Sequence, residues 1–177
     1  MRILTVVDYD EMWPALFENE RTLLQMTLGK VISRIHHIGS TSVPGLSAKP
    51  VIDILIEVAN LEELDSLNQA MEGVGYTVRG ENGILNRRYF TKGGNQRSHH
   101  IHAFATGDAQ IIKHLAFRDY HNRDKDGRLS IRYDPDSHTS FGVPSFIASN
   151  YVCDRVLHWY EGNQHAPLNG VMSFFHK

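Results

Sequence analysis

The chain has little of what marks secreted and membrane-spanning proteins. It contains one cysteine, Cys153, among 177 residues, so no disulfide can form within the chain and a disulfide-stapled secreted domain is excluded. No stretch approaches the roughly 18 apolar residues needed to cross a bilayer. The opening, MRILTVVDYDEMW, lacks the apolar core and the cleavage site of a secretory signal. We therefore expect a cytoplasmic protein with no membrane partner.

An excess of charge of one sign is also missing. The chain carries 18 Lys and Arg against 20 Asp and Glu, a formal net charge of -2. Non-specific binding to nucleic acids requires a surplus of positive charge, so we do not expect it. The 41% of apolar and 21% of charged residues are typical of a globular protein. Because 177 residues fit one domain, we expect a single domain over residues 1–177.

Hydrophobic periodicity predicts helices that alternate with short strands. We expect helices over about 13–28, 61–71, 111–116 and 146–160, strands over 31–38, 51–58, 76–78, 87–91 and 98–104, and a polar loop over 122–140. This order of elements predicts an α/β or α+β domain in which helices pack on one side of a mixed sheet.

The segment HHIGSTSVPGLSAKPVIDILIEV, residues 36–58, contains most of the candidate functional residues. In its second strand Ile52, Ile54 and Ile56 point to one face, and Asp53 points to the other. The strand follows a turn of small residues, whose backbone N–H groups can cradle a phosphate. Asp53 would then lie at the mouth of this turn.

Several side chains around the turn could contribute to such a site. Gly39, Ser40, Thr41 and Ser42 form the turn itself, and Lys49 could add a positive charge. The carboxylate of Asp53 could hold a divalent metal ion against the bound phosphates. The alternative is that the turn is only a tight connection and that Asp53 is a surface or capping residue.

A histidine-rich strand supplies further candidate metal ligands. His100 and His102 share one face of the strand 98–104. Together with Asp53 they would make a set of two imidazoles and one carboxylate, if the two strands are neighbours. Spacing alone favours the alternative, in which one histidine is buried and hydrogen-bonded while the other faces solvent.

These segments resemble the GrpB family. The resemblance rests on residues 36–58, on SHHIHAF at 98–104, on HLAFRDY at 114–120 and on the opening DYDEMWPALFENE. It implies a nucleotidyltransferase-like fold, and a domain of this kind also occurs fused to dephospho-CoA kinase. Beyond about residue 120 the chain departs from the family pattern, which continues with a lysine-rich helix.

The resemblance assigns roles position by position. Gly39 and Ser40 match the glycine-serine turn of nucleotidyltransferases, and Asp53 matches their first carboxylate. The second carboxylate is expected at position 55, which is leucine here. Glu57 cannot replace it, because four residues along a strand span about 13 Å. Arg118, in the FRDY motif, could contact a phosphate or pair with Asp119 or Asp53.

Three functional interpretations remain open at this stage. The first is a metal-dependent nucleotidyl- or phosphotransferase that binds a phosphate-bearing small molecule or nucleotide, with Asp53 as the catalytic residue. The second is a catalytically inactive nucleotide-binding or accessory domain with a protein partner, which Leu55 favours. The third and weakest is a metal-dependent hydrolase that uses the histidine cluster.

Overall fold

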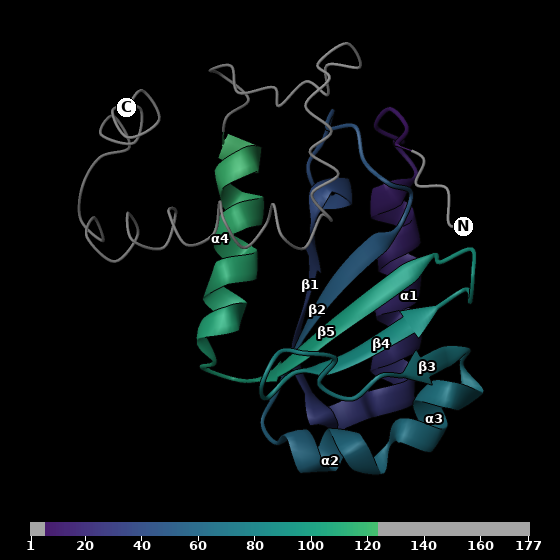
Figure 1. Ribbon diagram of the computed structural model, residues 1–177, viewed down its shortest axis with the longest axis vertical. Helices are drawn as coiled ribbons and strands as arrows, with labels where there is room; N and C mark the ends of the chain where they lie inside the picture. The colour runs from purple at the N-terminus through teal and green to yellow at the C-terminus, as the bar shows by residue number, and fades with distance from the viewer. Residues whose placement is uncertain (1–5, 124–177) are drawn as a thin grey trace, which may run out of the picture. The chain divides into compact units, whose positions relative to one another are not determined.

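The structure is a computed structural model that describes residues 6–123. The strands are β1 (Ile32–Ile38), β2 (Ile52–Val58), β3 (Tyr76–Val78), β4 (Arg88–Lys92) and β5 (His99–Ala105). They form one sheet in the order β1-β2-β5-β4-β3 (Figure 1). Only β2 and β5 are parallel, and the other neighbouring strands are antiparallel. The mixed sheet predicted from the sequence is therefore confirmed.

Four α-helices and two short 3-10 turns complete the described part. These are α1 (Trp13–Leu28), η1 (Gly29–Val31), η2 (Ser40–Ser42), α2 (Leu61–Ser66), α3 (Asn68–Gly73) and α4 (Ala109–Arg123). The helix predicted over 61–71 is split into α2 and α3, which meet at Leu67. The helix predicted over 111–116 extends further than expected, so that the FRDY motif lies inside α4. No helix within residues 6–123 is long and apolar enough to cross a membrane.

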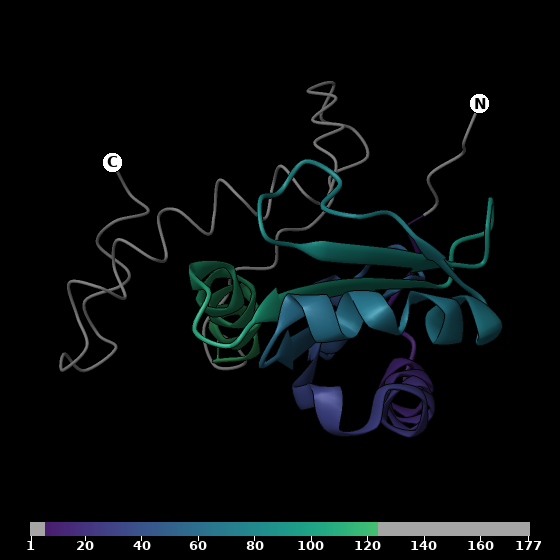
Figure 2. The same ribbon diagram turned by 90° about the horizontal axis from the view of Figure 1, so that it is seen from below.

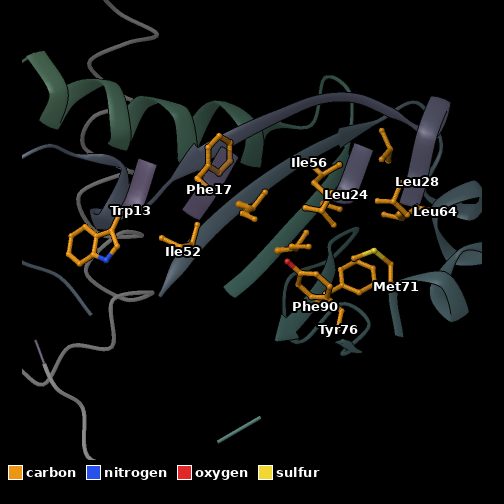
Figure 3. Packing of buried hydrophobic residues seen from close by; sticks show 14 of the residues in the cluster. Trp13, Phe17, Leu24, Leu28, Ile52, Ile56, Leu64, Met71, Tyr76 and Phe90 are labelled. Carbon is orange, nitrogen blue, oxygen red and sulfur yellow. The ribbon is translucent and has the colours of Figure 1, made fainter. Parts of the chain in front are cut away.

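The main core lies between the sheet and the first three helices. Helix α1 has a proline in its first turn and buries Phe17, Leu24 and Leu28 along one face. This face packs on the apolar stripe of β2, whose Ile54 and Ile56 are fully buried (Figure 3). Figure 2 shows α1, α2 and α3 on the same side of the sheet. Alternation along β2 thus directs the opposite set of side chains, including Asp53, away from this core.

The opposite face of the sheet is covered in part by α4. Ile111 of this helix forms a second apolar cluster with Ile38, Leu55 and Phe104. The prediction of helices on one side therefore holds for α1, α2 and α3 but not for α4. The apolar face of α4 needs a partner, and Leu55 and Phe104 supply one on the far side of the sheet.

Some sequence-based expectations fall outside the described residues. They are the helix predicted over 146–160, Cys153, and the part of the polar loop of 122–140 that lies beyond residue 123. The single-domain organisation over residues 1–177 likewise stays a prediction.

Two leucines of α1 test how the core stabilises the fold. Leu24 is fully buried, whereas Leu16 on the same helix is 42% exposed. Leu24→Ala should lower the free energy of unfolding by about 2–5 kcal/mol, because it removes buried apolar area and leaves a cavity. Leu16→Ala should change it by no more than about 0.5 kcal/mol. Urea unfolding of both variants measures the difference, and similar losses would contradict this packing.

Candidate functional site

Asp53 and His100 form a hydrogen-bonded pair on the face of the sheet opposite α1. They lie directly opposite each other on the parallel strands β2 and β5. Because a carboxylate can only accept, Nδ1–H of His100 donates to Oδ1 of Asp53, at 3.0 Å. The side chain of Asp53 is 28% exposed and that of His100 is 21% exposed, so a ligand can reach the pair. The bond fixes the carboxylate and leaves its second oxygen, Oδ2, facing the turn.

The turn after β1 lies directly against Asp53. Ile38, the last residue of β1, pairs with Asp53, which brings the following Gly39 to the carboxylate. A Cβ atom at Gly39 would lie 2.7 Å from Oδ2 of Asp53, closer than real side chains approach. Gly39 also has φ +71°, a conformation that side-chain-bearing residues rarely adopt. The backbone of the turn can therefore touch the carboxylate only because residue 39 is glycine.

The three hydroxyl groups of the turn have different environments. Thr41 is 1% exposed and donates to the carbonyl of Val51 at 3.3 Å, so it supports the turn from inside. Ser42 donates to the carbonyl of Gly39 at 2.6 Å. The side chain of Ser40 makes no hydrogen bond to any residue between 6 and 123. Ser40 is therefore the hydroxyl best placed to meet a ligand.

His37 supports the turn from the opposite face of the sheet. Its ring stacks on Phe17, with centroids 4.7 Å apart and planes 6° from parallel. Since the hydroxyl proton of Thr41 is used on Val51, Nε2–H of His37 donates to Thr41, at 3.1 Å. The pKa of His37 is lowered to about 4, mainly by burial; Asp53 opposes this effect and Arg118 adds to it. His37 is therefore neutral in the fold at pH 7.

His102 shares the face of His100 but belongs to a different cluster. Its Nδ1 accepts from an N–H of Arg87 at 3.4 Å, and its ring packs on Tyr89 and His114. Burial holds the pKa of His102 well below its usual range, and His114 and Arg87 add to this effect. No three His, Cys, Asp or Glu side chains within residues 6–123 are grouped as metal ligands. The structure thus brings Asp53 and His100 together, while His102 faces a guanidinium cation.

The two cations predicted for the site, Lys49 and Arg118, have different surroundings. Lys49 is half-buried, and its carbonyl accepts from the N–H of Val51 at 2.7 Å. Arg118 of α4 pairs with Asp119 at 2.7 Å, and one of its N–H groups reaches the carbonyl of His37 at 3.5 Å. Of the partners considered for Arg118, Asp119 is the one observed. The arginine nevertheless lies over the end of β1, just before Gly39.

The position of the second carboxylate is apolar. Leu55 is fully buried among Ile38 and Phe104, so no water or ion reaches it. Glu57, two residues further along β2, is 3% exposed and accepts from Nε2 of His36 at 2.7 Å. Asp53 is therefore the one carboxylate of β2 available to a ligand.

Sequence reasoning did not single out several residues on this face. Tyr89 packs against both His100 and His102, and Thr91 lies opposite His100 in the ladder of β4 and β5. Alternation along β4 could have placed Tyr89 and Thr91 on one face, once β4 was known to be a neighbour of β5. The positions of Arg87 and His114 depend on how the hairpin and α4 pack, which no local pattern reveals.

Comparison with known families identifies the chain. The family model described as GrpB protein matches residues 3–130. The chain belongs to the GrpB family. The family expected from the glycine-serine turn, the Asp53 strand and the FRDY motif is therefore confirmed.

Relatives of this GrpB chain include both short and longer proteins. The UPF0157 protein YqkA of Bacillus subtilis is 48% identical over 119 residues, which are 67% of this chain and 35% of YqkA. The chain thus spans about a third of the length of that curated relative. A dephospho-CoA kinase of Mycolicibacterium paratuberculosis is 36% identical over 74 residues, which are 40% of this chain and 18% of the kinase.

A solved structure matches the fold over most of the chain. The crystal structure of the conserved protein GrpB from Enterococcus faecalis has a TM-score of 0.76 and 34% sequence identity. The match covers 89% of this chain and 99% of the Enterococcus chain. The mixed sheet and its helices are therefore features that this chain shares with another GrpB protein.

The contact at Gly39 can be tested with two alanine variants. Gly39→Ala should lower the free energy of unfolding by about 2–4 kcal/mol, because it adds backbone strain and a clash with Asp53. Gly45→Ala is the matched control, since Gly45 has φ +79° but no atom within 4 Å of the added Cβ. It should lose only the strain energy, about 1–2 kcal/mol. Equal losses in urea unfolding would argue against a close contact at Gly39.

Burial of neutral His37 predicts a loss of stability in acid. The pKa of His37 is about 4 in the fold and about 6.5 in an unfolded chain. Its contribution is therefore fully present above pH 6.5 and is lost as the pH falls towards 4. The loss should be on the order of 2 kcal/mol at pH 4.5. His37→Gln keeps an N–H donor without titrating, so its stability should fall less steeply in urea unfolding at pH 4.5 to 7. Parallel pH profiles would refute this assignment.

Proposed function

We propose that the face carrying Asp53 binds the phosphate groups of a small molecule of the nucleotide class. The observation that carries this proposal is the close approach of Asp53 to Gly39, where an added Cβ would lie 2.7 Å from Oδ2. A glycine turn allows phosphate oxygens to approach the backbone, and a neighbouring carboxylate can bind a cation that those phosphates carry. Such an arrangement suits nucleotidyl or phosphoryl transfer, in which charge neutralisation is a large part of catalysis.

The donor set fits a metal ion that arrives with the substrate. Mg²⁺ is usually held by one or two carboxylates together with substrate phosphates and water. Asp53 offers one carboxylate next to the turn, whereas His102 is engaged by Arg87. A divalent ion bound to Asp53 and the phosphates would neutralise negative charge on the transferred group. The metal ion belongs to the substrate in this proposal.

The protein's own residues would orient the phosphates. His100 donates to Oδ1 of Asp53 and so holds the carboxylate with Oδ2 towards the turn. Ser40 would donate its free hydroxyl to a phosphate oxygen, and Lys49 would add positive charge. Arg118 lies over the end of β1 and would contact the same anion from α4.

A second candidate function is nucleotide binding without transfer. Its specific support is Leu55, which is fully buried at the position expected for a second carboxylate. Two-metal transfer needs carboxylates that hold ions about 4 Å apart, and Asp53 alone cannot do so. The match to part of a dephospho-CoA kinase is compatible with an accessory role beside an enzyme. Measured turnover of a nucleotide by the purified chain would eliminate this candidate.

Thermal unfolding with Mg²⁺ and nucleotides tests the binding site. A ligand at about 100 times its Kd stabilises by about 2.7 kcal/mol, which corresponds to a rise in Tm of about 5–10 °C. Asp53→Asn should abolish the rise, because it removes the negative charge that holds the cation. Glu63→Gln, on the exposed surface of α2, removes one negative charge elsewhere and should keep the rise. No shift with any pair of nucleotide and metal, or an undiminished shift in Asp53→Asn, would contradict the proposal.

A further inference from the structure

Arg79 lies on the same face of the sheet as Asp53. Val78, the last residue of β3, packs into the core on the side of α1. The strand pairing continues one residue further, because the N–H of Arg79 donates to the carbonyl of Tyr89 at 2.9 Å. Side chains alternate along an extended strand, so Arg79 points to the opposite face.

The guanidinium of Arg79 reaches towards the Asp53–His100 pair. Its Nε–H donates to Oγ1 of Thr91 at 3.5 Å. Thr91 lies opposite His100, and His100 lies opposite Asp53, so the three form a row across β4, β5 and β2. Two strand spacings separate Thr91 from Asp53, which is about 10 Å. The Gly39–Ser42 turn lies at one end of this row, and the guanidinium of Arg79 lies at the other end.

Arg79 differs from the neighbouring arginines in its partners. Arg88 forms an ion pair with Asp65 at 2.6 Å, and Arg118 forms one with Asp119. Arg79 is exposed and forms no ion pair within the described part of the chain. Guanidinium groups bind phosphate oxygens through several N–H donors at once. Arg79 thus offers positive charge and free donors at a fixed point of the row.

We propose that Arg79 binds a second phosphate group, so that the ligand of this face is a polyphosphate or a nucleoside polyphosphate. Its phosphate chain would run from the Gly39–Ser42 turn across His100 to Arg79. An orthophosphate ion, with all its oxygens around one phosphorus, cannot contact both ends. This inference rests on the proposed function and specifies its substrate class.

Calorimetric titration of the full chain with phosphates of increasing length tests the assignment. In the presence of Mg²⁺, orthophosphate, tripolyphosphate and ATP are added to the wild-type chain and to Arg79→Gln. The variant should bind tripolyphosphate and ATP about tenfold or more weakly, because it loses charged hydrogen bonds. Its orthophosphate affinity should stay within about twofold, since that ion binds at the turn. Arg79→Lys keeps the charge and should recover part of the affinity.

Control variants separate this inference from the proposed function. Arg34→Gln removes an exposed arginine near the other end of β1, so it should bind every ligand as the wild type does. Equal affinities of Arg79→Gln and Arg34→Gln for tripolyphosphate and ATP would overturn the role of Arg79 alone. If the wild-type chain bound none of the three ligands, both the role of Arg79 and the proposed function would be contradicted. Binding of ATP but not of tripolyphosphate would overturn the polyphosphate assignment and point to the nucleoside as the main determinant.

Discussion

The close approach of a glycine backbone to one carboxylate organises the rest of this face. Gly39 can lie against Asp53 only without a side chain, and only because Ile38 and Asp53 are paired at the ends of β1 and β2. The parallel strand β5 then places His100 on the other side of the carboxylate. Two different strand neighbours therefore fix one acidic side chain between a turn and an imidazole, and Thr41 and His37 hold the turn from behind.

The two faces of the sheet have different roles: one packs the main core, and the other carries the candidate site. One face of β2 is a continuous apolar stripe that packs under α1, and its burial supplies most of the core. On the other face α4 covers Leu55 and Phe104, while Asp53 and His100 stay partly exposed. The buried contact between His102 and Arg87 lies on the same face, two residues beyond His100 along β5. The candidate site therefore lies where the apolar cover of this face ends.

Much of the fold and part of the site could be predicted from local patterns. The helix 13–28, the strand of Asp53 and the small-residue turn all follow from spacing and residue type, and the structure has them within a residue or two. Local sequence patterns did not reveal which side chains contact one another in the fold. His102 has the spacing of a metal ligand beside His100, but its partner Arg87 comes from a hairpin whose packing depends on tertiary contacts. For the same reason α4 on the second face and the reach of Arg79 to Thr91 were not foreseen.

Backbone amide chemical shifts during a titration with Mg²⁺ and a nucleotide test the central claim most directly. If the turn and the carboxylate form the phosphate site, the largest changes should fall on the amides of Gly39 to Ser42 and of Asp53. The amides of α2 and α3, on the other side of the sheet, should not move. Changes confined to other parts of the chain, or none at saturating nucleotide, would show that this contact serves the fold and not a ligand.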